Sequence, residues 1–196
     1  ESICFNLKQQ NYACHAVHDH SGSFYQRNLV YPNLGFDTFT SLEYMNGVEM
    51  NPAGWAKDAV LTSQIRRALD STPGQDFVFA VSVQGHGKYP REKTDLQQTI
   101  TVSGAADEGR QTELEYYAGQ LHEMDAFVAE LLQMLEEYQE PTVLVLYGDH
   151  LPALELQAED LSRGGLYQSE YVIWSNFALS AAAGEQKNTA AAGRLG

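Results

Sequence analysis

The sequence VLVLYGDHLPAL, residues 143–154, carries the strongest indication of the fold. Its first five residues form a continuous apolar run, which is typical of a strand buried on both faces of a parallel sheet. The run ends at Gly148, and Asp149 and His150 follow at once. A carboxylate and an imidazole together suit zinc, manganese or iron. The stretch therefore predicts a buried strand that ends on two candidate metal ligands.

A second interpretation of this pair needs no metal. An Asp that follows a strand often caps the next turn, and a neighbouring His can lie in a hydrogen-bonded pocket. Gly148 allows close backbone approach, and the position after a buried strand is where ligands bind in α/β sheets. These two features favour the metal-ligand interpretation.

A second apolar run, DFVFAVSVQGHGKYP at residues 76–90, repeats the arrangement and ends on His86 between two glycines. An amphipathic helix is predicted before it at residues 55–74, and a long one after it at residues 112–138, which leads to the strand at 142–148. Helix, buried strand, helix, buried strand is the pattern of an α/β domain with a largely parallel sheet. Because ligands gather at the carboxyl ends of such strands, we expect His86 at the same sheet edge as the Asp-His pair.

The segment around the first predicted strand, residues 11–18, is rich in polar side chains. The stretch HAVHDHSGSFYQR at residues 15–27 holds four residues of types that bind metals: His15, His18, Asp19 and His20. Alternate strand residues point to opposite faces, so these four do not predict a zinc site of their own. Arg27 is a candidate for binding an anionic substrate, with a surface ion pair as the alternative. His86 is a candidate donor to a substrate oxygen or a general acid, with an idle loop histidine as the alternative.

The composition limits the partners. The 196 residues, 43% of them hydrophobic, suit one α/β domain or part of a larger one. The net charge of -14 disfavours nucleic acid and anionic membrane surfaces, so an anionic substrate would need a local positive pocket. No apolar stretch approaches the roughly 20 residues that span a bilayer. Cys4 and Cys14 fit no zinc spacing and could pair or remain free thiols.

Together these motifs resemble the extracellular sulfatase-like domain of lipoteichoic acid synthases and related phosphoglycerol transferases, in the alkaline phosphatase superfamily. The matching segments are HDHSGSFYQRN, LGFDTF, FAVSVQGHGKYP and VLVLYGDHLP, in the family's order. The resemblance implies an α/β, three-layer fold with a largely parallel central sheet. It predicts a partial catalytic domain at residues 1–177, followed by an Ala/Gly-rich end at residues 178–196 that we expect to be a weak helix or poorly ordered.

The resemblance also implies roles for the residues that match the family's motifs. Asp149 and His150 would be two ligands of a catalytic divalent metal, most often manganese, with zinc, magnesium and calcium as alternatives. His86 would be catalytic and contact the phosphoryl group or the leaving oxygen. The glycerol phosphate pocket would be lined by His18, Tyr25, Arg27 and His86. Tyr25 stands where the synthases often have tryptophan, which keeps an aromatic wall but changes its shape.

One departure limits what this chain does alone. The family's nucleophile is a threonine and a further metal ligand is a glutamate, both from earlier segments, and nothing in residues 1–17 matches either. The chain thus resembles the C-terminal portion of the domain, incomplete at its N-terminus. By itself we expect it to be inactive and to bind metal weakly.

The implied function is that of an enzyme acting at the extracellular face of a bacterial cell membrane. It would transfer a phosphoglycerol-type group from a phospholipid, with a lipid head group or a glycerol phosphate polymer as substrate. Any membrane contact would come from segments absent from this chain. Two alternatives remain open: a sulfatase or phosphodiesterase that uses water as acceptor, and a catalytically silent binding domain that keeps the fold. The residues before Glu1 would discriminate between them.

Overall fold

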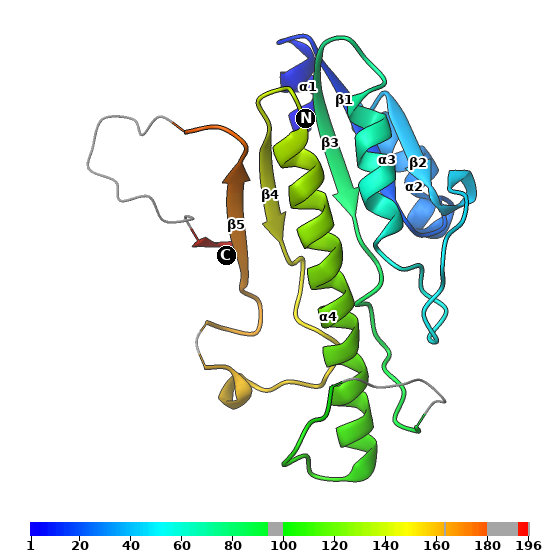
Figure 1. Cartoon of the computed structure of the whole chain (residues 1–196), viewed down its shortest axis with the longest axis vertical. Helices are drawn as coiled ribbons and strands as arrows, with labels where there is room; N and C mark the ends of the chain where they lie inside the picture. The colour runs from blue at the N-terminus through cyan, green and yellow to red at the C-terminus, as the bar shows by residue number, and fades with distance from the viewer. Residues whose placement is uncertain (94–99, 163, 180–191, 196) are drawn as a thin grey trace. The chain divides into compact units, whose positions relative to one another are not determined.

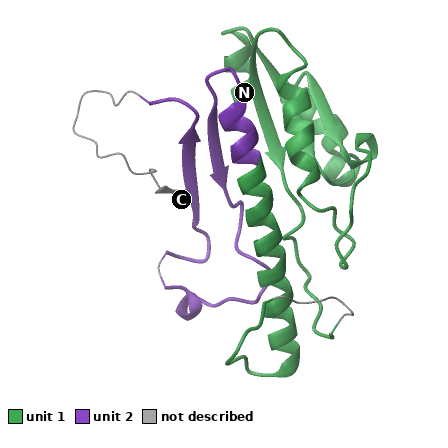
Figure 2. Cartoon of the chain, in the orientation of Figure 1, with its two compact units in different colours: residues 1–130 green, residues 131–196 purple. Residues whose placement is uncertain are grey.

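Two separate sheets organise the chain in the computed structural model, which describes residues 1–93, 100–162, 164–179 and 192–195 (Figure 1). Each sheet belongs to one of two compact units, residues 1–130 and residues 131–196 (Figure 2). The predicted α/β class is confirmed, with a parallel sheet in the first unit.

The first unit is built on three parallel strands in the order β2-β1-β3. Their bounds are β1 Tyr12–His18, β2 Thr38–Ser41 and β3 Gln75–Val81. In the register, His18 lies opposite both Ser41 and Val81, so the three strands end level with one another. The central strand β1 is buried from Cys14 to His18, whereas the edge strand β3 is only half-buried. The apolar run at β3 predicted burial on both faces, and its edge position explains the difference.

Helices accompany this sheet. The helices that begin in the first unit are α1 Ile3–Lys8, α2 Arg27–Asn33, α3 Val60–Leu69 and α4 Glu108–Glu137, with short 3-10 turns η1 Phe24–Gln26 and η2 Leu42–Tyr44. Helix α3 buries Leu61, Ile65 and Ala68, which are spaced to share one face. Burying each large aliphatic side chain contributes ~1.5–3 kcal/mol. In the described part of the chain, no helix combines the length and the apolar character needed to cross a bilayer.

The long amphipathic helix predicted at residues 112–138 is α4, but its buried residues are not all apolar. Tyr116 and Gln120 are buried, whereas Leu121 is 43% exposed. The buried amide is satisfied, because Gln120 Oε1 accepts hydrogen bonds from Asn51 (3.0 Å) and Gln84 (3.2 Å). The first half of α4 therefore packs on a polar network that Gln120 forms with Asn51 and Gln84.

The two cysteines, Cys4 and Cys14, are buried free thiols and do not form a disulfide. Cys14 lies on β1, and its thiol points to the Cys4 carbonyl oxygen on α1 at 3.9 Å. Burial raises the pKa of the Cys14 thiol to about 12. Both thiols therefore act as small core side chains.

The second unit is antiparallel. Its strands β4 Val143–Tyr147, β5 Ser169–Ser175 and β6 Ala192–Leu195 pair in that order, and the turn η3 Ala158–Asp160 lies between β4 and β5. The prediction that β4 is buried on both faces is wrong. Val143, Val145 and Tyr147 are 51%, 49% and 50% exposed, and since alternate strand residues share a face, one face of β4 is uncovered. Most of the Ala/Gly-rich end, residues 180–191 and 196, lies outside the described residues.

Candidate functional site

The carboxyl edge of the parallel sheet begins with His18, the last residue of β1. Its side chain is buried, and Nδ1 lies 2.8 Å from the carbonyl oxygen of Val81, the last residue of β3. Because a carbonyl only accepts, Nδ1 carries the proton and Nε2 is left as an acceptor. Burial lowers the pKa of His18, which keeps the ring neutral at pH 7.

A row of rings connects His18 to His86, although the two residues are far apart in sequence. The ring centroids of His18 and His20 are 5.8 Å apart, and those of His20 and Trp55 are 5.3 Å apart. Trp55 in turn lies 4.8 Å from His86. The structure therefore brings the two predicted site histidines into one cluster, through two residues for which the sequence indicated no such role.

Arg27 lies beside this cluster at the start of α2. Its guanidinium carbon is 5.3 Å from the ring centroid of Phe24 and 5.4 Å from that of Tyr25. Its Nη1 is buried and has no hydrogen-bond partner among the described residues. The charge of Arg27 helps to lower the pKa values of His18 and His20, for both of which burial is the larger cause.

The backbone before Arg27 is held in an unusual conformation. Tyr25 and Gln26 have φ angles of 53° and 55°, in the left-handed region that residues other than glycine rarely adopt. Such residues cost on the order of 1–3 kcal/mol each and cluster at functional sites. Tyr25 is 77% exposed, and its ring lies next to the Arg27 guanidinium.

Glu43 fixes the loop that joins β1 to these residues. Its carboxylate accepts hydrogen bonds from the Ser41 hydroxyl (2.6 Å), the Ser21 hydroxyl (2.8 Å) and the Gly22 backbone N–H (3.1 Å). The Ser41 hydrogen bond is the largest of the effects that lower the pKa of Glu43 to about 2. No sequence motif marks Glu43, because its partners come from two separate segments.

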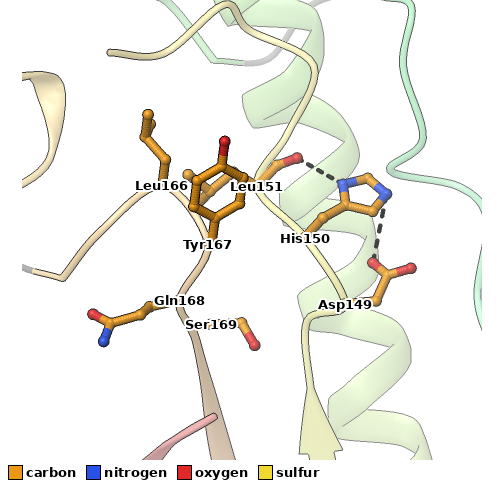
Figure 3. A pocket seen from close by; sticks show the side chains of 7 residues that line it. All are labelled: Asp149, His150, Leu151, Leu166, Tyr167, Gln168 and Ser169. Carbon is orange, nitrogen blue, oxygen red and sulfur yellow. Dashed lines mark hydrogen bonds and ion pairs between the residues drawn. The ribbon is translucent and has the colours of Figure 1, made fainter. Parts of the chain in front are cut away.

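Asp149 and His150 lie in the second unit, directly after β4. Both are well exposed, and Nε2 of His150 is 3.6 Å from Oδ1 of Asp149. They line one side of an open hollow of about 140 Å³ whose other side is formed by residues 166–169 (Figure 3). The neighbouring oxygen and nitrogen donors fit two positions of a metal site. Within the described ranges, no group of three or more His, Cys, Asp or Glu side chains could hold a metal, so this pair is at most part of a site.

The expected meeting of His86 with the Asp-His pair stays a prediction. His86 belongs to the first unit and the pair to the second, and the strands that precede them hydrogen-bond in different sheets. The roles predicted for His18, Tyr25, Arg27, His86, Asp149 and His150 likewise stay predictions.

Comparison with known proteins gives a consistent family. The sulfatase family model matches residues 1–193. A Rhizobium meliloti (strain 1021) protein named for cyclic beta-1,2-glucan modification is 35% identical over 153 residues, 78% of this chain and 24% of that protein. Lipoteichoic acid synthase 2 of Bacillus subtilis (strain 168) is 24% identical over 153 residues, 76% of this chain and 23% of that protein. The chain spans about a quarter of the length of these relatives.

Solved structures share the fold. The Streptococcus pyogenes phosphoglycerol transferase GacH, solved in complex with sn-glycerol-1-phosphate, has a TM-score of 0.70 and 26% identity, covering 90% of this chain and 45% of that chain. The Listeria monocytogenes lipoteichoic acid synthase LtaP has a TM-score of 0.65 and 22% identity, covering 88% and 45%. The predicted resemblance and its alkaline phosphatase superfamily fold are confirmed.

Proposed function

The chain belongs to the sulfatase family, and we propose that it carries the phosphate-binding side of an enzyme that transfers a phosphoglycerol-type group from a phosphodiester lipid. The observation that carries the proposal is the guanidinium of Arg27, whose buried Nη1 has no partner in the part of the chain that the structure describes. Leaving a buried charged donor unsatisfied is costly, so the site calls for an anion. A phosphate group matches the planar fork of Arg.

The surroundings of Arg27 suit a glycerol phosphate head group. Nε2 of His18 can accept a hydrogen bond from a glycerol hydroxyl, and the neutral imidazole of His20 can hydrogen-bond phosphate or glycerol oxygens, without adding a second buried charge. The exposed ring of Tyr25 offers an apolar wall to the glycerol carbons. The likeness to a phosphoglycerol transferase solved with sn-glycerol-1-phosphate supports the same ligand here.

In the proposed reaction, a threonine hydroxyl outside residues 1–196 attacks the phosphorus of the donor. The bond from phosphorus to the lipid alcohol breaks, and glycerol phosphate stays on the nucleophile until an acceptor hydroxyl displaces it. Arg27 donates hydrogen bonds to the non-bridging oxygens as negative charge grows on them. His86 delivers a proton to the departing lipid alkoxide. His18, held by the Val81 carbonyl, positions the glycerol.

Asp149 and His150 are the proposed ligands that this chain gives to a divalent metal, manganese in the first instance. When bound, such an ion would neutralise phosphoryl charge and make the nucleophile easier to deprotonate. The hard oxygen and the imidazole nitrogen of the pair suit manganese or zinc. The remaining ligands would come from outside this pair, since a tight site needs three or four.

For the acceptor we propose a hydroxyl group of a glucan at the extracellular face of the membrane. This choice rests on the relative at 35% identity, which is named for glucan modification. A glycerol phosphate polymer and water are the other acceptors to be compared. Water would make the enzyme a phosphodiesterase.

A transfer assay with the full-length protein tests the proposal. The donor is a phosphatidylglycerol labelled in its head group, and cyclic β-1,2-glucan, a glycerol phosphate polymer and water compete as acceptors. Arg27→Lys should lower kcat/KM by roughly 10- to 100-fold, because the bidentate fork is lost. Arg66→Lys is the matched control, since Arg66 forms an exposed ion pair with Asp70. Cleavage of an aryl sulfate without phosphoglycerol transfer, or normal transfer by Arg27→Lys, would contradict it.

A further inference from the structure

A pair of carboxyl groups lies fully buried beneath the histidine cluster. Asp19 directly follows β1, Asp58 precedes α3, and each is 0% exposed. As carboxylates, both oxygens of Asp19 and Oδ2 of Asp58 would have no donor among the described residues. The two side chains contact each other, and two carboxyl groups can hydrogen-bond only when one of them is protonated. A proton shared by the pair therefore accounts for one oxygen of each carboxyl group.

The electrostatics agree with this reading of the contacts. Burial raises the pKa of Asp19 to about 7, and burial together with the neighbouring Asp19 charge raises the pKa of Asp58 to about 8. Two like charges in contact inside a protein cannot both be ionised at low cost. The pair consequently keeps at least one proton near neutral pH, and the two values belong to the pair as a whole.

Asp58 also holds the turn that carries His86. Its Oδ1 accepts hydrogen bonds from the backbone N–H groups of Val83 (3.1 Å) and Gln84 (3.0 Å), and the Asp58 backbone N–H donates to Gln84 Oε1 (2.8 Å). The N–H of His86 donates to the Val83 carbonyl at 2.9 Å. On the other side of the pair, Asp19 is the residue next to His18. The carboxyl contact thus joins the two strand ends that carry the two histidines.

We propose that Asp19 and Asp58 are positioning residues for the site: by sharing a proton, they hold the end of β1, with His18, against the turn after β3, with His86. The catalytic meaning of this inference rests on the proposed function, whereas the geometry stands without it. When the last shared proton is lost, repulsion between the carboxylates loosens the turn and moves His86 relative to His18.

Charged and titratable groups surround the pair on several sides. On β1, Nδ1 of His18 is 3.5 Å from Oδ1 of Asp19 but is bonded to the Val81 carbonyl. The charge of Arg27 on α2 helps to lower the pKa of His18. On α4, Glu123 accepts a hydrogen bond from Gln84 and forms an ion pair with Lys57. The pKa values of His18 and His20 are lowered, so both rings are neutral before the pair ionises. A change between pH 7 and pH 9 in the backbone amides of Val83 and Gln84, which donate to Asp58, therefore reports on the carboxyl pair.

The test follows the backbone amide signals of Val83 and Gln84 and the imidazole signals of His18 by NMR from pH 6 to pH 9. In the wild-type chain all three should change with one shared inflection near pH 7–8. Asp58→Asn keeps an acceptor for the two amides and gives Asp19 a permanent donor, so it should remove the inflection and keep the signals near their low-pH positions. Asp58→Ala should shift both amides at every pH.

Two further measurements make the test decisive. Asp70→Asn, at the exposed end of α3, should retain the wild-type inflection. Binding of sn-glycerol-1-phosphate should weaken several-fold more between pH 6.5 and pH 9 in the wild-type chain than in Asp58→Asn, a ratio in which the ionisation of the phosphate itself cancels. Three results would overturn the proposal that the pair shares a proton. The inflection could persist in Asp58→Asn, the amide signals could be independent of pH, or the inflection could move when Mg²⁺ or Ca²⁺ is added. A clear inflection without any glycerol phosphate binding would leave the positioning role standing and refute the proposed function.

Discussion

At the scale of single residues, Gly22 shows how closely the loop after β1 approaches β2. A Cβ added at Gly22 would lie 2.8 Å from Oγ and 3.1 Å from Cβ of Ser41, the residue that hydrogen-bonds Glu43. We predict that Gly22→Ala lowers the free energy of unfolding by ~1–3 kcal/mol, measured by urea denaturation, because the loop must shift. Gly74→Ala, where nothing lies within 4 Å, should stay within ~0.5 kcal/mol of wild type. Equal stabilities for the two variants would contradict the close packing.

The sequence identified some of the clustered residues but not the ones that connect them. His18, Arg27 and His86 were predictable, since they stand in motifs at strand ends and in a matching family segment. Trp55 and Glu43 were not, because ring stacking and carboxylate contacts between distant segments leave no local pattern. The buried Asp58 was likewise hidden at the start of an ordinary amphipathic helix.

At the scale of elements, the contact between the end of β1 and the start of α3 makes stability depend on pH. The unfolded carboxyl groups titrate near 3.8, whereas Asp19 and Asp58 in the folded chain titrate near 7 and 8. Between these limits the folded state binds more protons, so its stability is fully present below about pH 4 and is lost as the pH rises toward 8. We predict a loss on the order of a few kcal/mol in urea denaturation at constant ionic strength.

The control for this prediction is the double variant Asp19→Asn/Asp58→Asn. It removes both titrating groups but keeps side chains that can hydrogen-bond each other, so its stability should vary much less across the same pH range. A wild-type chain whose stability rises from pH 5 to pH 8 would show that the pair is ionised in the folded state.

Element positions followed from the sequence better than element surroundings did. The predicted strands at β1, β3 and β4 and the helices at α3 and α4 all occur close to the expected residues. The apolar run at β4 nevertheless leaves Val145 half exposed, and β4 pairs antiparallel with β5. Hydrophobic runs report strand formation, but they encode neither the direction of the neighbouring strand nor whether a further layer covers it.

At the scale of the whole molecule, the chain spans about a quarter of the length of its curated relatives. We therefore expect it to hold only part of a metal site. We predict that calorimetric titration of the chain with Mn²⁺ shows only weak binding, because Asp149 and His150 supply two ligands where a tight site needs three or four. His150→Ala should abolish it, and His122→Ala, on the exposed surface of α4, should not. Tight one-to-one binding to the wild-type chain would contradict the assignment of a partial site.

Direct titration of the chain with sn-glycerol-1-phosphate tests whether Arg27 and the histidine cluster form a glycerol phosphate site. Calorimetry should show binding that Arg27→Lys weakens by roughly tenfold or more, as expected for loss of a charge-assisted bidentate contact. Arg66→Lys should bind like wild type, and the imidazole signals of His18, His20 and His86 should shift on binding. Unchanged affinity in Arg27→Lys, or shifts confined to other residues, would contradict the account.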